Sequence, residues 1–535
     1  MTQLDSTIGK ILGLTSGLTV ERVDNCIDFI KEISESHGFS LGTSNLRKLY
    51  LPLCSRVFQL LVGLEQDGSL LSEASEEISA LGCSAEFLLA SLHKIQDAFI
   101  GSDRWSNRLF RDLYRRLVYN QLAPSTGAAE SFERTDSIWD QSSINRLRTI
   151  AGSRGLVSDI YPHRFNAKDQ LDIKNCFLRY GLVNIDLHPD TRCSAAMLEK
   201  RLSIINKIHG IVPYCFDKLF FSLCILLVNP ILAEELDRSI SIVSNELDGN
   251  ITKCLISSQS LHTSYMYRIL ASVLSERRQA VTISCQHGAS YGVDAFCSAE
   301  LIEFASSDYF LSWGWETQFY EGAQAVAGSI SASAIKIPYS EREFGHAVFV
   351  INNVRPHPFS LHPDDNPLIY YRSIEEIKQI VLGLGHIDKF TVKPFPGERD
   401  QELTFLFSDL NSRGAIMDCS VPLYSLLNTC RLMIFNRFST GALEALSTNT
   451  PCICLIPSLS CIRPSAARII RVLERVGIVH FDVKSLVNHV LSLEGNPAAW
   501  WFSKEVQASV SLVRHLFANN KTSWIENLEN IIQSL

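Results

Sequence analysis

Three polar residues directly follow an apolar run near the middle of the chain. The run ends at Cys285, and Gln286, His287 and Gly288 come next. Ligands of open α/β sheets bind at the carboxyl ends of the strands, so Gln286 and Gly288 are candidates for lining a ligand site. His287 is suited to general-base work because its unperturbed pKa is about 6.5, and Asp294 is a second candidate base. The alternative is a structural histidine that donates to a carbonyl.

A second polar group follows the apolar run that ends at Phe435. Ser439 and Thr440 stand where a short helix is expected to begin, and the free N–H groups and dipole of a helix start attract phosphate. Glu444 lies on the first turn, where its carboxylate could accept hydrogen bonds from ribose hydroxyls. Ordinary helix capping explains the serine and the threonine equally well, so the nucleotide-site hypothesis depends on the whole arrangement.

Basic side chains form a third group, in the two loops expected to follow strands of the same region. Arg355, His357, Lys393 and Arg399 are donors that can bind a phosphate or a carboxylate. Isolated surface cations are usually only solvated. Their shared position after strands is what favours a donor-binding role for Arg355, Lys393 and Arg399.

The elements that must position these groups alternate along the second half of the chain. Strands are predicted at 347–354, 389–394, 431–435 and 451–456, and helices at 373–385, 422–430, 441–446 and 464–475. Ser373 and Glu376 form a capping-box pattern that predicts the start of the first of these helices. Strands alternating with helices indicate parallel βαβ crossovers and an α/β fold.

The chain as a whole divides into three regions. We expect a helical N-terminal region over 1–130, a first α/β domain over 131–340, and a second α/β domain with C-terminal helices over 341–535, because cores rarely grow beyond about 300 residues. Trp313 and Trp315 are interpreted as core packing. One face of the helix expected over 464–475 carries three arginines, Arg468, Arg471 and Arg475. This face is either simply solvated or contacts an anionic acceptor or a membrane surface.

Composition excludes several classes of protein. The net charge of -8 and the lack of a dense basic run argue against a nucleic-acid partner. The 15 cysteines include no C-x-x-C pair, so we expect reduced, buried thiols and no metal site. No apolar run reaches the roughly 20 residues that span a bilayer. A cytoplasmic protein is expected, with peripheral contact at the inner face of the membrane left open.

Missing motifs narrow the chemistry further. The sequence has no G-x-x-x-x-G-K-[ST], G-x-S-x-G, H-E-x-x-H or G-x-G-x-x-G, which removes support for P-loop, α/β-hydrolase, zincin and dinucleotide chemistry. It also has no D-x-D motif of the kind that presents Mg²⁺ to a nucleotide diphosphate. We therefore expect a metal-independent mechanism without a bound cofactor.

Taken together, the Gln-His-Gly segment, the segment over 307–315 that follows it, and the strand, Ser-Thr-Gly and Glu444 unit resemble a family of transferases of bacterial surface-carbohydrate biosynthesis. That family is related to capsule Kdo transferases and teichoic-acid glycerophosphotransferases, and the resemblance covers about residues 145–500. It implies a GT-B fold, in which two Rossmann-like domains face each other. The family pattern has a second glycine where this chain has Ala289.

Carried over by position, the resemblance implies that Ser439, Thr440 and Glu444 bind the phosphate and ribose of the donor. It places His287 on the acceptor side, and Arg355 and Arg399 at a donor phosphate or sugar carboxylate.

Three functions remain open from the sequence. The leading hypothesis is a glycosyltransferase that moves a sugar, such as a CMP-activated Kdo or nonulosonic acid, onto a surface glycan, glycolipid or protein acceptor. His287 or Asp294 would then deprotonate the acceptor hydroxyl. The second is transfer of an alditol phosphate from a CDP-linked donor. The third is a non-catalytic nucleotide- or glycan-binding protein that assembles a complex.

Overall fold

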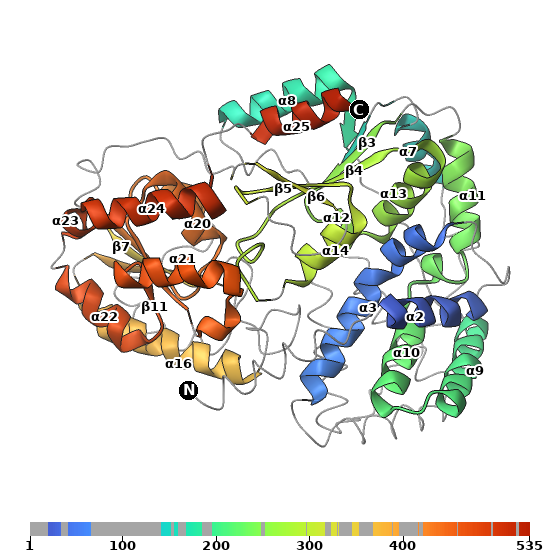
Figure 1. Cartoon of the computed structure of the whole chain (residues 1–535), viewed down its shortest axis with the longest axis horizontal. Coiled ribbons are helices and arrows are strands. Elements are labelled where there is room, and N and C mark those ends of the chain that lie inside the picture. The colour runs from blue at the N-terminus through green and yellow to red at the C-terminus, as the bar shows by residue number, and fades with distance from the viewer. Residues whose placement is uncertain are drawn as a thin grey trace.

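The chain forms two parallel β-sheets, each flanked by helices (Figure 1). The computed structural model describes residues 20–33, 41–65, 141–150, 153, 155–158, 167–184, 195–247, 252–295, 297–315, 323–328, 330, 345–352, 367–387, 389–394, 416, 421–456, 458–493, 496–519 and 524–535. The expected domain boundaries near 130 and 340 lie outside these residues.

The first sheet is built from short apolar runs of the middle of the chain. Its strands are β1 (Gly155–Ser158), β2 (Leu182–Asn184), β3 (Cys254–Ser257), β4 (Val281–Cys285), β5 (Tyr309–Ser312) and β6 (Gln324–Ala327). They lie in the order β2-β1-β3-β4-β5-β6, and every neighbouring pair is parallel. The strands β1 and β3 are buried along their whole length, as expected for a sheet covered on both faces.

The second sheet repeats this plan. Its strands are β7 (Ala347–Val350), β8 (Phe390–Lys393), β9 (Leu432–Phe435), β10 (Cys452–Leu455) and β11 (Val479–His480). The order is β11-β10-β9-β7-β8, again all parallel. Counted in chain order, both sheets share the arrangement 2-1-3-4-5, and the first adds one strand at its far edge. The predicted α/β, GT-B-like pair of Rossmann-like sheets is therefore confirmed.

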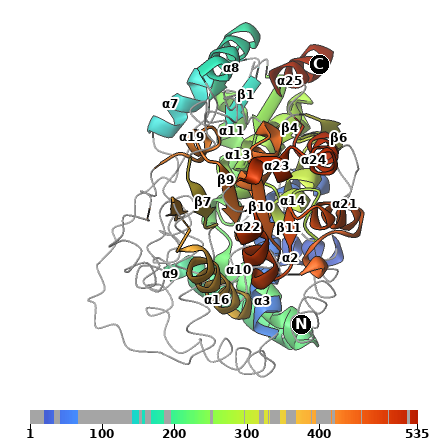
Figure 2. The ribbon, with the colours of Figure 1, turned by 90° about the vertical axis from the view of Figure 1, so that its left-hand side faces the viewer.

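Helices cover both faces of the second sheet because side chains alternate along each strand. Met433 and Phe435 of β9 pack with α20 (Thr440–Thr448), α21 (Pro464–Arg475) and α24 (Lys504–Phe517). Ile434 packs on the other face with α16 (Pro367–Leu384) and α22 (Val483–Ser492). Figure 2 shows α16 and α21 on opposite sides of these strands. Short helices among the described residues of this half include α19 (Leu423–Leu426) and α23 (Pro497–Trp501).

The first sheet is covered on one face by helices from the N-terminal part of the chain. A continuous core joins Leu156 and Leu255 of the sheet to the helical layer. The helices of this side are α2 (Val20–Ile33), α3 (Thr43–Glu65), α7 (Gln141–Ile150), α9 (Ala195–Ile211), α10 (Cys215–Leu227), α11 (Leu236–Glu246), α12 (Ser260–Thr263), α13 (Tyr265–Arg278) and α14 (Ser298–Ser306). The N-terminal helices α2 and α3 thus share one core with the first sheet.

The last helix of the chain returns to the first sheet. Leu528 and Ile531 of α25 (Trp524–Ser534) belong to the core that includes Val157 and Ile256. Figure 1 shows α25 beside α8 (Ala167–Tyr180), and Arg179 of α8 pairs with Glu529. The far face of the first sheet is therefore closed by the C-terminal segment rather than by its own half alone.

Two local predictions need correction. The helix predicted over 373–385 begins earlier, at Pro367, so the capping box at Ser373 is wrong. The Ser373 side chain is buried and accepts a hydrogen bond from Arg437 instead of capping a helix. The helix predicted over 422–430 is a single turn, α19. Among the described residues, no helix has the length and apolar composition that crossing a membrane requires.

Candidate active site between the two sheets

The loop that follows β4 is held by the amide of Gln286. This side chain is buried, and its Oε1 accepts hydrogen bonds from the backbone N of Trp313 at 2.8 Å and from Nε1 of Trp315 at 3.0 Å. Its Nε2 donates to the carbonyl of Gly288 at 2.8 Å. Both ends of the amide are thus engaged within the protein, and Gln286 sets the path of the loop that carries His287.

His287 belongs to a chain of three polar side chains. The Tyr291 hydroxyl lies 3.0 Å from Nδ1 and 3.2 Å from Nε2 of His287, and it donates to Oε2 of Glu303 at 3.0 Å. Since the single phenolic proton goes to Glu303, the phenolic oxygen can accept from the imidazole. Burial, with Glu303 nearby, raises the pKa of Tyr291 well above its usual range, so the phenol stays protonated. The arrangement can hold an imidazolium that forms at His287.

Packing makes this loop rigid. Gly292 has a φ of 71°, and a Cβ there would meet Nε1 of Trp315 at 2.9 Å, so both conformation and space require glycine. Trp313 and Trp315 are buried, and Trp315 stacks on Phe310 with ring centroids 5.6 Å apart. The interpretation of both tryptophans as packing residues agrees with these positions.

The same loop contacts the second half of the molecule. The backbone N of Ala289 donates to Oγ1 of Thr440 at 3.2 Å, which joins the Gln-His-Gly segment to the start of α20. Further along, Asp294 forms a short antiparallel bridge with Ile462, just before α21. The loop that carries His287 therefore contacts the start of α20, where the phosphate site is predicted.

A buried ion pair strengthens this contact. Glu300 of α14 is fully buried and receives Nη1 and Nη2 of Arg463 at 3.1 and 3.0 Å. Its Oε2 also accepts from the backbone N of Gly292 at 3.2 Å. Burial raises the pKa of Glu300, and the Arg463 charge opposes that shift. Neither residue was predicted, because their separation in the sequence hides the pairing.

The second polar group lies where the order of the second sheet reverses. The strands β7 and β9 are neighbours there, and the crevice between their carboxyl ends is where ligands of such sheets bind. Asn436, directly after β9, accepts at Oδ1 from the backbone N of Asn352 at 2.8 Å and from its Nδ2 at 3.1 Å. Asn352 follows β7, so the two asparagines span this reversal point.

Two polar atoms at this point are buried and unsatisfied. Nδ2 of Asn436 and Oγ of Ser439 have no hydrogen-bond partner among the described residues. Ser439 is the N-cap of α20, yet its side chain makes no capping hydrogen bond. A buried polar group without a partner costs about 1–3 kcal/mol, so these two atoms are available to a polar ligand.

The remaining predicted residues differ in placement. Glu444 is half-buried on α20 but lies beyond the first turn, where it was predicted, because the helix begins already at Thr440. Gly288 is half-buried in the loop after β4. Lys393 is buried at the end of β8, beside the reversal point rather than on an open surface. Arg355 and Arg399, like His357, lie outside the described residues. The structure therefore brings Ser439, Thr440 and the His287 loop together.

Comparison with known proteins agrees with an enzyme. The model of a family described as the LIC12162 family transferase matches residues 85–532. The chain belongs to the LIC12162 transferase family. A search of curated protein sequences gave no match.

Solved structures similar to this LIC12162 family transferase include "S. aureus MnaA-UDP co-structure", with a TM-score of 0.39, 9% identity, and coverage of 71% of this chain and 95% of that chain. Another is the glycotransferase of kitacinnamycin, with a TM-score of 0.32, 11% identity, and coverage of 74% and 95%. TM-scores this low do not by themselves support a fold assignment, which is therefore based on the two parallel sheets of this chain.

One further buried residue near the predicted phosphate site was missed from the sequence. Arg437 follows Asn436 and is buried. Its guanidinium donates hydrogen bonds to the Glu376 carboxylate at 3.3 Å and to the carbonyl of Asn436 at 2.8 Å. It also donates to the Ser373 hydroxyl. It ties the turn before α20 to α16. A basic residue after an apolar run was the available signal, but nothing local shows that it points inward.

Proposed function

We propose that this transferase is a glycosyltransferase that moves a sugar from a CMP-linked donor, a Kdo-like or nonulosonic acid, onto a glycan, glycolipid or protein acceptor. The carrying observation is the pair of buried, unsatisfied polar atoms, Asn436 Nδ2 and Ser439 Oγ, beside the start of α20. A nucleotide phosphate supplies acceptors for both and lies favourably at the positive end of the helix.

On the donor side, each residue has a separate task. The N–H groups at the start of α20 and the hydroxyl of Ser439 bind the phosphate. Glu444, on the same helix, accepts hydrogen bonds from the ribose hydroxyls. Helix dipole and hydrogen bonds then stabilise the charge that develops on the departing nucleotide. This donor site uses the protein's own groups, without a bound cofactor.

On the acceptor side, His287 takes the proton of the attacking hydroxyl. The acceptor oxygen forms the new bond to the anomeric carbon while the bond from that carbon to the phosphate oxygen breaks, and the nucleotide monophosphate leaves. The Tyr291 and Glu303 pair holds the ring and stabilises the imidazolium. Asp294 lies on the same loop, next to the second half.

Binding is the first test of this function. The purified full chain is titrated with CMP, CDP, UDP and GDP by calorimetry, with Glu444→Ala and the surface control Glu375→Ala measured in parallel. We expect tightest binding of a cytidine nucleotide, weakened about tenfold by Glu444→Ala because a hydrogen bond to a hydroxyl pair is lost. Equal affinity of Glu444→Ala and the parent would remove the ribose role.

Turnover separates this function from its rivals. Incubation with CMP-linked sugar acids and with CDP-linked alditols, each over a panel of acceptors, is followed by mass spectrometry. Release of nucleotide monophosphate with a phosphorus-free adduct supports the glycosyltransferase. A phosphorus-containing adduct would mean alditol-phosphate transfer, and tight nucleotide binding without any product would mean a binding protein.

A further inference from the structure

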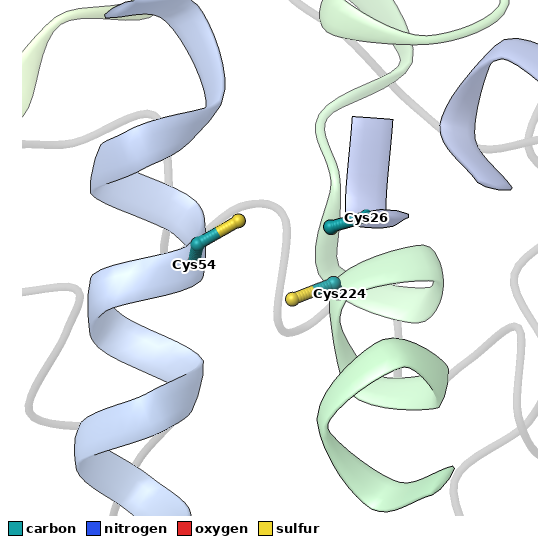
Figure 3. Close-up of side chains that lie close together, drawn as sticks. All are labelled: Cys26, Cys54 and Cys224. Carbon is teal, nitrogen blue, oxygen red and sulfur yellow. The ribbon is translucent and has the colours of Figure 1, made fainter. Parts of the chain in front are cut away.

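Three cysteines from three different helices meet in the helical layer beside the first sheet. Cys26 lies on α2, Cys54 on α3 and Cys224 on α10, and all three are fully buried (Figure 3). Among the described residues they are the one group of His, Cys, Asp or Glu side chains whose ligand atoms converge. The cluster belongs to the core of the N-terminal helices, apart from the loop that carries His287.

The spacing of the sulfur atoms suits a shared ion. The three Sγ atoms lie within 4.8 Å of one another, and Figure 3 shows Cys54 and Cys224 with their sulfurs directed toward the space between the helices. A cation at about 2.3 Å from each sulfur needs sulfurs about 4 Å apart. Sulfur atoms within 4.8 Å of one another are thus less than about 1 Å from the spacing that such an ion requires.

The surroundings select the kind of ion. The cluster lies in an apolar core, and no fourth His, Cys, Asp or Glu ligand joins it among the described residues. The hydroxyl of the nearby Tyr50 donates a hydrogen bond to the carbonyl of Leu232 and is therefore engaged outside the cluster. Structural zinc takes four ligands, whereas soft thiolates without hard ligands favour Cu(I).

Simple packing is the competing explanation. All eleven described free cysteines are buried, so the chain often uses cysteine as a small apolar side chain. Packing alone, however, does not require three of them to converge from α2, α3 and α10. A disulfide between two of the three is another alternative, which would leave one thiol over.

We propose that Cys26, Cys54 and Cys224 form a three-coordinate site for a soft monovalent cation of the Cu(I) class. The bound ion links α2 and α3 to α10, and so fastens the N-terminal helices to the half of the molecule that carries His287. Each thiol that binds releases its proton to solvent, so binding strengthens as pH rises.

Copper binding by the full chain tests the site. Reduced, metal-free protein is loaded anaerobically with Cu(I) in competition with a colorimetric Cu(I) chelator, and metal per chain is measured by mass spectrometry. Cys26→Ala, Cys54→Ala and Cys224→Ala are compared with Cys430→Ala, a buried cysteine outside the cluster. We expect one tightly held copper in the parent and in Cys430→Ala, and at least about a hundredfold weaker binding in each cluster variant.

A second measurement covers variants that fold poorly. In the parent, Cu(I) raises the melting temperature and produces a thiolate-to-copper charge-transfer absorption, and Cys430→Ala shows the same. Copper retained equally by the cluster variants would overturn the site. So would zinc held more tightly than Cu(I), or peptide mapping that finds a disulfide among the three cysteines in protein purified without reductant.

Discussion

The two sheets share one strand order, yet their reversal points are chemically different. In the first sheet, the hydroxyls of Ser158 and Ser260 bond each other at 2.6 Å, and Ser257 Oγ accepts from the backbone N of Ser260 at 2.7 Å. In the second sheet, Asn436 Nδ2 and Ser439 Oγ lack partners among the described residues. The polar groups at the first point are paired within the protein, whereas two polar atoms at the second are not. The first half therefore serves the site through its β4 loop instead.

The largest expected effect concerns that loop. His287→Ala should lower kcat about 100- to 10,000-fold while the affinity for the donor nucleotide changes little, because the base acts in the reaction and not on the nucleotide. Steady-state kinetics and nucleotide calorimetry measure the two quantities separately. His386→Ala, an exposed histidine of the second half, is the matched control. Turnover of His287→Ala within a few-fold of the parent would assign the base elsewhere.

The second effect tests whether the halves depend on their shared loop. Arg463→Met leaves Glu300 buried without its cation and should destabilise the protein by about 3 kcal/mol in denaturant unfolding. The control Arg471→Met breaks the exposed pair with Glu474 and should cost less than about 1 kcal/mol.

The pH dependence of Arg463→Met has a definite sign. Burial already raises the pKa of Glu300, and loss of the Arg463 charge raises it further. An acid with a raised pKa in the folded state binds its proton more readily there, so stability falls as pH rises through that interval. The deficit of Arg463→Met relative to the parent should therefore be larger at pH 8 than at pH 5. A deficit independent of pH would show that Glu300 does not sense this arginine.

The third prediction compares one serine substitution at each of the two reversal points. Ser439→Ala removes a hydroxyl that has no partner in the described structure, so the unliganded protein should keep its stability while nucleotide affinity falls. Ser257→Ala removes the acceptor of the Ser260 N–H, so it should cost about 1 kcal/mol of stability and leave nucleotide affinity unchanged. Melting temperature and calorimetry of both variants decide. If both variants changed stability and nucleotide affinity alike, the proposed difference between the two reversal points would be wrong.

What the sequence predicted well was local. The strands β7 to β10 and the helices α20 and α21 were found because apolar runs are separated by glycine, proline and asparagine. What it missed depends on contacts between distant residues. Ser373 matched a capping box, but its side chain is used by Arg437, and the helix begins at Pro367. The Glu300 and Arg463 pair has no local signature for the same reason.

The site shows the same division. The polar residues after β4 and β9 could be singled out, because residues at carboxyl ends of parallel strands share one edge. The sequence does not show that the Gln286 amide is used by Gly288 and Trp313, or that the Ser439 hydroxyl has no partner among the described residues, because both depend on tertiary contacts. Three cysteines converging from α2, α3 and α10 were invisible, since metal-site patterns are recognised by short spacing.

The smallest expected effect is an acid sensitivity confined to the second half. His480 is buried, with Nε2 3.1 Å from Nδ1 of His489 and Nδ1 2.8 Å from Oγ of Ser485. Burial lowers the pKa of His480 to about 4, and the charge of the neighbouring His489 acts in the same direction. Unfolded histidine titrates near about 6.5, so this residue's share of stability is present above that pH and is lost as pH falls toward 4.

The variant His480→Gln should remove that share, so the loss of stability between pH 7 and pH 5 should shrink by about 1 kcal/mol relative to the parent. Trp500 contacts His489 edge-on, with ring centroids 5.0 Å apart. Amide hydrogen exchange of α22 reports unfolding of this region, while far-UV circular dichroism reports the whole chain. An equal loss in parent and variant would mean that the two histidines titrate alike in both states. Loss of exchange protection in α22 at a higher pH than the loss of far-UV signal would locate the acid-labile region around α22, away from the loop that carries His287.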